Sequence, residues 1–200
     1  MVTILKKWQD LPENLKNEAV KEYYDILAIK KSSLVLKRIF DILVACILLV
    51  ILLPFFLIIG LSIKFDSKGS ILFRQTRVTQ YGRHFRIFKF RTMVENAEII
   101  GSQVTGKNDS RVTQVGKFLR KVRLDELPQL FNVISGDMTF VGARPEVVKY
   151  VDQYTNEMLA TLLLPAGVTS EASILYKDEA DLLANTENYD LTYVQQILPE

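Results

Sequence analysis

One uncharged stretch dominates the hydrophobic pattern of this 200-residue chain. Residues 42–63 form a run of 22 residues without a charged side chain, close to the roughly 20 that a helix needs to cross the apolar core of a bilayer. The run has no polar face, and a chain of this length offers too small a core to bury such a helix on all sides. The pattern therefore predicts a membrane-embedded helix.

The charges around this run, and a proline within it, bear on how the helix meets the membrane. Pro54 lies near the middle of the run, where its ring and its missing amide proton would kink a helix. Basic residues flank the run on both sides: Lys30, Lys31, Lys37 and Arg38 before it, and Lys64, Lys68, Arg74 and Arg77 after it. Because positive flanks favour the cytoplasmic side, a spanning helix cannot satisfy both of them. A re-entrant helix, which enters and leaves through one face, can do so, and both topologies are kept at this point.

A β-hairpin is predicted directly after the apolar run. Residues 71–78 and 84–91 are rich in strand-forming side chains and flank a short turn. In the second arm phenylalanines alternate with Lys89 and Arg91, so the two cations are expected on one face of the strand. Two cations on one face can reach the same anion, although a solvated strand face would show the same pattern.

Amphipathic helices are expected after the hairpin. Residues 115–124 predict a short basic helix. Apolar side chains from position 127 to 134 then repeat with helical spacing, with Asp125 placed to cap the helix and a glycine placed to end it. A last helix is predicted to begin at Pro145 and to be stopped by Pro165.

Composition and charge narrow the chemistry. The single cysteine, Cys46, excludes a disulfide framework or a cysteine zinc site within the chain, and the single histidine, His84, argues against a histidine-dependent mechanism. Charge is segregated, because residues 64–91 hold eight Lys or Arg and one acid, while residues 146–200 hold ten acids and two lysines. A basic region of this size attracts an anionic partner such as nucleic acid, phospholipid or a phosphorylated metabolite.

With cysteine and histidine chemistry set aside, the remaining candidate chemistry is that of carboxylates assisted by cations. Asp125 and Glu126 stand at a predicted helix start, where unsatisfied amides and the helix dipole attract a phosphate or its metal counter-ion. The pair could equally be a helix cap followed by a first-turn acid. Arg144, just before a proline that opens a helix, is either an anion clamp or a surface arginine with a local ion pair.

Several segments together resemble the bacterial sugar transferases, and more narrowly the monotopic polyprenyl-phosphate phosphoglycosyl transferases. The resemblance covers about residues 36–183, in order and in spacing. It is carried by KRIFD at 37–41, the apolar run with its central proline, KFRTM at 89–93, LDELPQLFNV at 124–133, GDM at 136–138 and GARP at 142–145. Each segment alone is weak, but the combination is specific.

The resemblance implies transfer of a sugar-1-phosphate from a nucleotide sugar, usually a UDP-sugar, to undecaprenyl or another polyprenyl phosphate, with release of UMP. This reaction starts the assembly of exopolysaccharide, capsule, O-antigen or glycoprotein glycans. The implied location is the bacterial cytoplasmic (inner) membrane, with the catalytic domain on the cytoplasmic face. Downstream glycosyltransferases are conceivable partners, and nucleic acid is not expected.

Residue roles follow from the same resemblance. It implies that Asp125 is a nucleophile that forms a covalent phosphosugar intermediate, that Glu126 assists, and that Mg²⁺ binds at Asp125. It also implies that Arg144 holds phosphate, which suits the bidentate geometry of a guanidinium. Assigning Lys89 and Arg91 to the same phosphate-binding task is our inference from their shared strand face.

The expected fold is mainly α with a small β-hairpin (α+β). It combines a re-entrant membrane helix kinked at Pro54, amphipathic interfacial helices and a compact cytoplasmic catalytic domain. We divide the chain into a helical surface or interfacial segment at residues 1–35, the membrane helix at 36–66 and the catalytic domain at 67–200. Members of the family usually continue beyond the equivalent of residue 200, so the last domain is expected to be a truncated or a short form.

Two other functions stay open at the level of sequence. The chain could be an inactive membrane-anchored scaffold that recruits glycan-assembly enzymes. It could also be a membrane-anchored module that binds nucleic acid or anionic lipid through the basic hairpin. The binding module gives Asp125 and Glu126 no role, and the scaffold predicts that no UMP is released from any sugar nucleotide.

Overall fold

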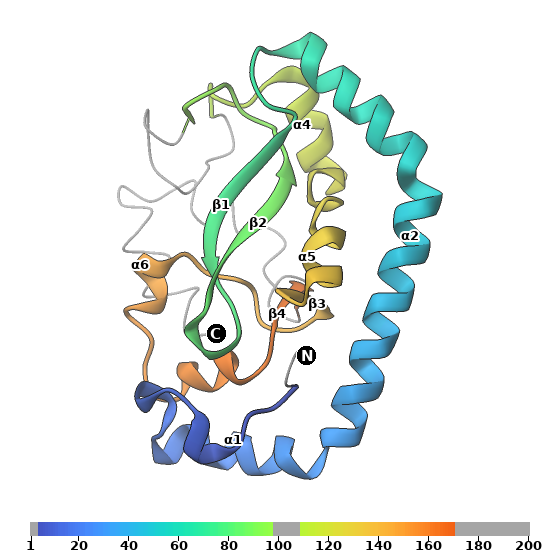
Figure 1. Ribbon diagram of the computed structural model, residues 1–200. Coiled ribbons are helices and arrows are strands. Elements are labelled where there is room, and N and C mark those ends of the chain that lie inside the picture. Colours follow the sequence, from blue (N-terminus) through green and yellow to red (C-terminus); the bar gives the residue numbers. More distant parts are fainter. Residues whose placement is uncertain (1–3, 98–108, 171–200) are drawn as a thin grey trace.

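The computed structural model describes residues 4–97 and 109–170, and this part of the chain is mainly helical (Figure 1). Its α-helices are α1 (Glu18–Ile29), α2 (Lys31–Asp66), α4 (Gln114–Lys121), α5 (Gln129–Ser135) and α6 (Val148–Val151). Its strands are β1 (Leu72–Val78), β2 (His84–Phe90), β3 (Met138–Val141) and β4 (Ala166–Thr169). Short 3-10 helices are η1 (Trp8–Asp10), η2 (Glu13–Leu15), η3 (Gln80–Gly82), η4 (Leu124–Glu126) and η5 (Met158–Leu163). The expected combination of helices, a long apolar helix and a small antiparallel hairpin is confirmed.

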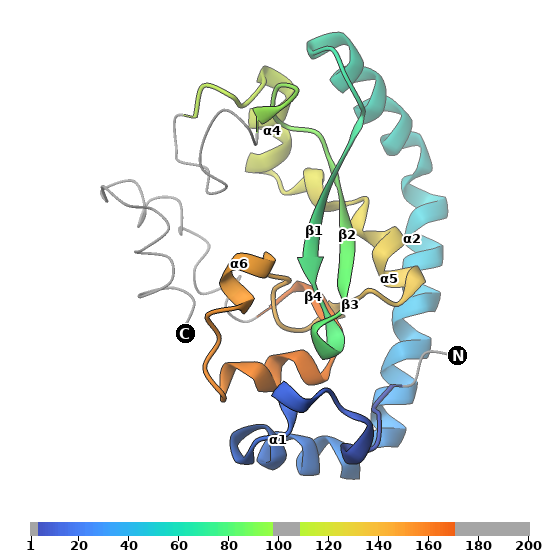
Figure 2. The same cartoon turned by 60° about the vertical axis from the view of Figure 1, so that its left-hand side comes forward.

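The apolar run lies within α2, a helix of 36 residues that bows along one side of the molecule (Figures 1 and 2). In the described part of the chain it is the one helix long and apolar enough to cross a membrane. Only 11% of its most apolar window is buried, so it is not the core helix of a soluble protein. The helix continues through Pro54, and the re-entrant kink that we expected there stays a prediction.

The two faces of α2 differ in what they contact. Ala45, Ile59 and Ile63 on the inner face are buried against the rest of the protein. The outer face exposes large apolar side chains at Leu36, Phe40, Leu43, Ile47, Val50, Ile51, Ile58, Leu61 and Phe65. An exposed apolar surface of this extent marks a site of membrane or protein contact.

Both ends of α2 are attached to the same body of the protein. Near its start, the Arg38 guanidinium donates to the carbonyls of Val133 and Ile134, at 2.6 and 3.0 Å. These carbonyls belong to the last turn of α5, where a cation is favoured by the helix dipole. Near its end, Asp66 Oδ2 accepts from the Val115 amide at 3.0 Å. The helix is therefore held along its length rather than at one terminus.

The hairpin forms where the sequence predicts it. Strands β1 and β2 pair antiparallel from Leu72 opposite Phe90 to Val78 opposite His84. The edge of β2 that does not pair with β1 is contacted by α5. There the buried Asn132 side chain accepts a hydrogen bond from the Phe88 amide and donates one to the Arg86 carbonyl, both at 2.9 Å. The amide thus occupies the place of a neighbouring strand and fixes α5 against β2.

The prediction of one continuous helix between Pro145 and Pro165 is wrong. The backbone is still extended at Val147, and only the four residues of α6 are α-helical, before η5 begins at Met158. The segment stays extended because it is bonded to the hairpin: the Val78 amide of β1 donates a hydrogen bond to the Glu146 carbonyl at 2.9 Å. Strands β3 and β4 then pair in parallel, a feature that the sequence did not indicate.

Residues near the N-terminus pack onto the hairpin turn. Leu15, Val20 and Tyr24 share a buried cluster with Val78 and Leu163. Tyr81 in the turn also accepts a hydrogen bond from the Lys6 amide at its hydroxyl, at 2.8 Å. The N-terminal segment therefore contributes to the same core as the hairpin and η5.

Candidate active site

Asp125 and Glu126 lie in η4, a short turn between α4 and α5. The prediction that Asp125 caps the following helix is wrong: α5 begins at Gln129 after Pro128, and its N-cap position has no side-chain hydrogen bond. Arg123, with φ of 58° in the left-handed region, turns the chain so that the two acids precede the helix rather than cap it.

Asp125 is a buried carboxylate whose hydrogen-bonding capacity is not filled. Its residue is 8% exposed, and its Oδ1 atom has no hydrogen-bond partner among the described residues. Burial raises the pKa of Asp125 and the neighbouring Glu126 charge adds to this, while the Lys89 and Arg120 charges act in the opposite direction. An acceptor oxygen of this kind is available to a metal or to an electrophile.

Glu126 is bound to the hairpin by an ion pair. Lys89 Nζ on β2 donates to Glu126 Oε1 at 2.8 Å, with both side chains about three-quarters buried. Burial alone would raise the pKa of Glu126. The attraction and hydrogen bond of Lys89, with the Arg144 and Arg123 charges, outweigh it and lower the pKa. Glu126 therefore stays ionised while its neighbour is the more readily protonated acid.

Arg144 lies on the turn after β3 and contributes its charge to the same centre. Its positive charge contributes to lowering the pKa of Glu126. Its Nε is 3.7 Å from Glu146 Oε1. The structure thus pairs Glu126 of η4 with Lys89 of β2, and the charges of Arg144 and Lys89 act on the pKa values of the two acids although these residues are far apart in the sequence.

The Arg91 side chain contacts the loop after α2, and its role in binding an anion together with Lys89 stays a prediction. Its Nη2 donates to the carbonyl and hydroxyl of Ser67, at 2.7 and 2.8 Å, just beyond the end of α2. The Arg91 amide, one residue beyond β2, still donates to the Ile71 carbonyl at 2.9 Å. The guanidinium is buried, and its Nε and Nη1 have no partner among the described residues.

Sequence reasoning missed Arg120. This residue of α4 is deeply enough buried that desolvation lowers its pKa, and the attraction of Asp125 opposes the change. Its charge in turn acts on the pKa of Asp125. The predicted basic helix at residues 115–124 contained the signal, but only the structure shows which cation of that helix acts on the pKa of Asp125.

The carboxylate pair suits a magnesium ion better than an all-protein metal site. The described residues contain no group of three or more His, Cys, Asp or Glu that could hold a metal. Mg²⁺ commonly takes one or two carboxylates and completes its shell with water and substrate phosphates. The unpaired Oδ1 of Asp125 beside Glu126 fits that requirement.

Residues 32–198 match the sequence profile of the family described as bacterial sugar transferase. The chain belongs to this family. It is 39% identical over 165 residues to a UDP-N-acetylgalactosamine-undecaprenyl-phosphate N-acetylgalactosaminephosphotransferase of Aeromonas hydrophila, covering 80% of this chain and 39% of the relative. It is 41% identical over 172 residues to a UDP-glucose:undecaprenyl-phosphate glucose-1-phosphate transferase of Klebsiella pneumoniae, covering 82% of this chain and 37% of that relative.

A shorter relative is similar over most of both chains. The exopolysaccharide production protein ExoY of Sinorhizobium fredii is 36% identical over 174 residues, covering 80% of this chain and 76% of the relative. By contrast, the alignments to the Aeromonas and Klebsiella proteins cover little more than a third of those proteins' length. The sequence resemblance to bacterial sugar transferases is confirmed, and residues 4–31 lie before the matched region.

Proposed function

We propose that this protein transfers a sugar-1-phosphate from a UDP-sugar to a polyprenyl phosphate at the bacterial cytoplasmic membrane. The observation that carries the proposal is the buried Asp125 carboxylate, whose unpaired oxygen lies in a centre that also contains Glu126, Lys89, Arg120 and Arg144. The names of the relatives supply the substrate class, because the Aeromonas and Klebsiella proteins are named for transfer from a UDP-sugar to undecaprenyl phosphate.

The first step in this mechanism forms a covalent intermediate on Asp125. A carboxylate oxygen attacks the phosphorus that carries the sugar, and the bond from this phosphorus to the oxygen of UMP breaks. UMP leaves with the electron pair of that bond, and the sugar-1-phosphate stays attached to the enzyme as an acyl phosphate. The raised pKa of Asp125 and its burial make the ionised carboxylate a stronger nucleophile than a solvated one.

The second step transfers the sugar-1-phosphate to the lipid. A phosphate oxygen of polyprenyl phosphate attacks the same phosphorus, and the Asp125 carboxylate leaves with its bonding electrons, which restores the enzyme. Both steps bring anions together, so the Arg144 and Arg120 cations would offset repulsion as the phosphates enter. Lys89 would keep Glu126 ionised and oriented through their 2.8 Å contact.

Mg²⁺ is part of this proposal. Asp125 would hold the ion through its unpaired Oδ1, with the neighbouring Glu126 assisting. When bound, the ion would supply positive charge to the diphosphate and to the leaving UMP.

The topology proposed for α2 is re-entrant or in-plane, with both flanks on the cytoplasmic side. Three observations support it: basic residues on both flanks, attachment of Arg38 and Asp66 to one body, and an apolar outer face. A helix fastened along one side to a charged domain cannot also be surrounded by lipid as a spanning helix would be. This arrangement would place the carboxylate centre beside the membrane surface, where a polyprenyl phosphate headgroup resides.

Turnover with both substrates tests the function. Purified protein in nanodiscs is given undecaprenyl phosphate, Mg²⁺ and, in turn, UDP-glucose, UDP-galactose and UDP-N-acetylgalactosamine. We expect UMP release and lipid-linked sugar phosphate in equal amounts with at least one donor, and loss of both by about 10³-fold or more in Asp125→Asn. No UMP with any donor, from folded protein, would support the scaffold alternative.

A further inference from the structure

Glu146 is a buried acid that the proposed mechanism does not use. It is 5% exposed and lies two residues after Arg144, in the segment between β3 and α6. Its two carboxylate oxygens form ion pairs with different arginines: Oε1 is 3.7 Å from Arg144 Nε, and Oε2 is 3.9 Å from Arg77 Nη1. A buried carboxylate is tolerated when cations pair with it. The acid therefore joins a cation of the proposed active site to a cation of the hairpin.

The backbone just before Arg144 is fixed to β4. The Gly142 amide donates a hydrogen bond to the Thr169 carbonyl at 3.1 Å, and the Gly167 amide donates one to the Ala143 carbonyl at 2.7 Å. These two bonds extend the pairing of β3 with β4 into the segment that carries the arginine. They restrict where the Arg144 side chain can begin.

The backbone just after Arg144 is fixed to the hairpin. Arg77 Nη1 on β1 donates to the Pro145 carbonyl at 3.1 Å, and the Val78 amide at the end of β1 donates to the Glu146 carbonyl at 2.9 Å. Figure 1 shows the segment between β3 and α6 passing beside this end of β1. Arg77 thus contacts both the backbone of this segment and the buried acid that pairs with Arg144.

The exposures of Arg144 and Glu146 differ in a way that separates their roles. The Arg144 side chain is 45% exposed, whereas the Glu146 side chain is 6% exposed. A substrate phosphate can therefore approach the guanidinium but not the carboxylate. An arginine loses conformational freedom when it binds a ligand, and an ion pair that already restricts the side chain reduces this cost. Glu146 is thus placed to orient Arg144 without touching the substrate.

We propose that Glu146 is a positioning residue for Arg144, and that Arg77 holds Glu146 in place from the hairpin. The inference rests on the proposed function, in which Arg144 offsets the charge of incoming phosphates, and it adds the residues that orient this cation. The hairpin then positions two cations of one centre, because β2 carries Lys89 and β1 holds Glu146.

A double-mutant cycle tests whether Glu146 acts through Arg144. Glu146→Gln keeps the size of the side chain and removes its charge. It is compared with wild type, Arg144→Ala and the double variant, in nanodiscs with Mg²⁺, undecaprenyl phosphate and the UDP-sugar donor. We expect Glu146→Gln to lower kcat/KM for the UDP-sugar about tenfold, but less than about twofold when Arg144 is already alanine. Equal losses in both backgrounds, no loss in either, or a gain from Glu146→Gln would overturn the proposal.

Asp137→Asn is the matched control for this cycle. Asp137 pairs with Arg83 at 2.7 Å, just before β2, so this change also converts a carboxylate that is ion-paired to the hairpin into an amide. We expect kcat/KM to stay within about twofold of wild type. A loss as large as that of Glu146→Gln would show that any weakened attachment of the hairpin lowers activity, which would contradict a specific role for Glu146.

Arginine side-chain NMR tests the positioning without any turnover. In protein that carries isotope-labelled arginine, the Nε–Hε signal of Arg144 is assigned by its loss in Arg144→Lys. We expect this signal to lie apart from those of flexible arginines in wild type and Asp137→Asn, and to move to their position in Glu146→Gln. An unchanged signal in Glu146→Gln would overturn the proposal. A wild type that shows the separate signal but releases no UMP with any donor would instead count against the proposed function.

Discussion

The state of Asp125 is the central feature at the scale of single residues. Its carboxylate is removed from water, and one of its oxygens lacks a hydrogen bond in the described structure. An unfilled buried acceptor costs about 1 to 3 kcal/mol of stability. The Asp125 carboxylate therefore lowers the stability of the fold, and the same unpaired oxygen is suited to react with a phosphorus centre.

Asp125→Asn should stabilise the protein while it abolishes transfer. The folded-state pKa of Asp125 is raised, so wild-type stability falls as pH rises from the ordinary pKa of an aspartate through the raised value. Asparagine carries no charge, and we expect it to increase the free energy of unfolding by about 1 kcal/mol at pH 7.5, measured without Mg²⁺.

The same comparison at low pH is the control. As the pH falls through the raised pKa of Asp125, the carboxyl becomes protonated in the folded protein, so the difference in Tm between the two proteins should shrink. A variant that is less stable than wild type at pH 7.5 would contradict the account of Asp125 as a buried charge with an unpaired oxygen.

At the scale of elements, the position of the two carboxylates depends on how α5 is held against the hairpin. Asn132 is fully buried and forms both hydrogen bonds to the edge of β2, at Phe88 and Arg86. One residue beyond Phe88, Lys89 reaches Glu126 in the turn before α5. The amide of Asn132 is thus the fixed link between the strand that carries the cation and the helix that follows the acids.

Replacing this link should weaken both stability and chemistry. Asn132→Leu keeps a similar volume but leaves the two backbone groups of β2 without their partner, so we expect a loss of about 2 kcal/mol in the free energy of unfolding. Adduct formation from UDP-sugar should slow by tenfold or more, because Lys89 and Glu126 are no longer held together. Ser135→Ala on the same helix removes two hydroxyl contacts, to the Asn132 carbonyl and to Asp137, and should cost about 1 kcal/mol or less. Equal effects of the two substitutions on unfolding would contradict the role of Asn132.

The sequence predicted these elements unevenly, for physical reasons. The hairpin and α4 were predictable because their patterns are local. The helix expected after Pro145 failed because a long-range hydrogen bond between Glu146 and Val78 keeps the backbone extended. The contact between the Arg91 side chain and the Ser67 carbonyl was likewise not readable from the sequence, because it joins positions 24 residues apart.

At the scale of the whole molecule, α2 forms one long side to which the rest of the protein is attached (Figure 2). The apolar run and its basic flanks were readable in the sequence. The inner face of α2 was not readable in the sequence, because a helix that is apolar all round has no polar side to show which residues contact the rest of the protein. Only tertiary contacts at Ala45, Ile59 and Ile63 distinguish the two faces.

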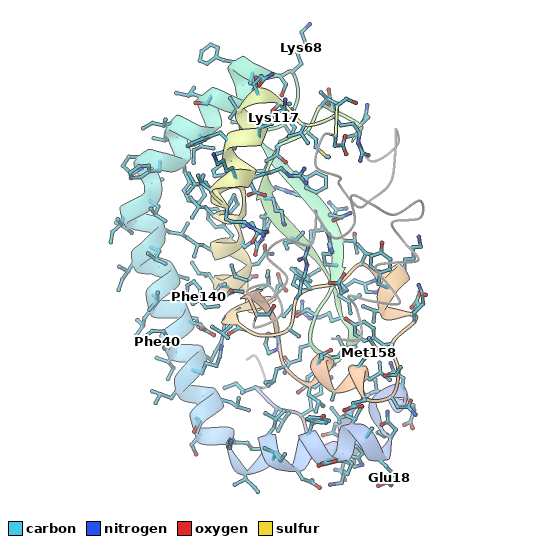
Figure 3. All side chains as sticks on the ribbon, turned by 180° about the vertical axis from the view of Figure 1, so that it is seen from behind. Glu18, Phe40, Lys68, Lys117, Phe140 and Met158 are labelled. Carbon is cyan, nitrogen blue, oxygen red and sulfur yellow. The ribbon has the colours of Figure 1, made fainter. Side chains whose placement is uncertain are left out.

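Cysteine labelling in spheroplasts should distinguish the two topologies. Cys46 on α2 is exposed and is first changed to serine, and single cysteines are then introduced as Ser33→Cys and Lys68→Cys, at the two ends of α2. Lys68 is seen beyond the end of the helix in Figure 3. We expect neither cysteine to react with a membrane-impermeant maleimide until the cells are lysed. Labelling of one end in intact spheroplasts would show a spanning helix and contradict the proposed placement.

Intact-protein mass spectrometry tests the central claim most directly. Wild-type protein and Asp125→Asn are incubated with Mg²⁺ and each UDP-sugar, without polyprenyl phosphate. The account predicts that wild type gains the mass of one sugar phosphate with its donor, that Asp125→Asn gains none, and that undecaprenyl phosphate removes the added mass. An adduct that forms equally in Asp125→Asn, or lipid-linked product made at full rate with no adduct on the wild type, would contradict a covalent intermediate on Asp125.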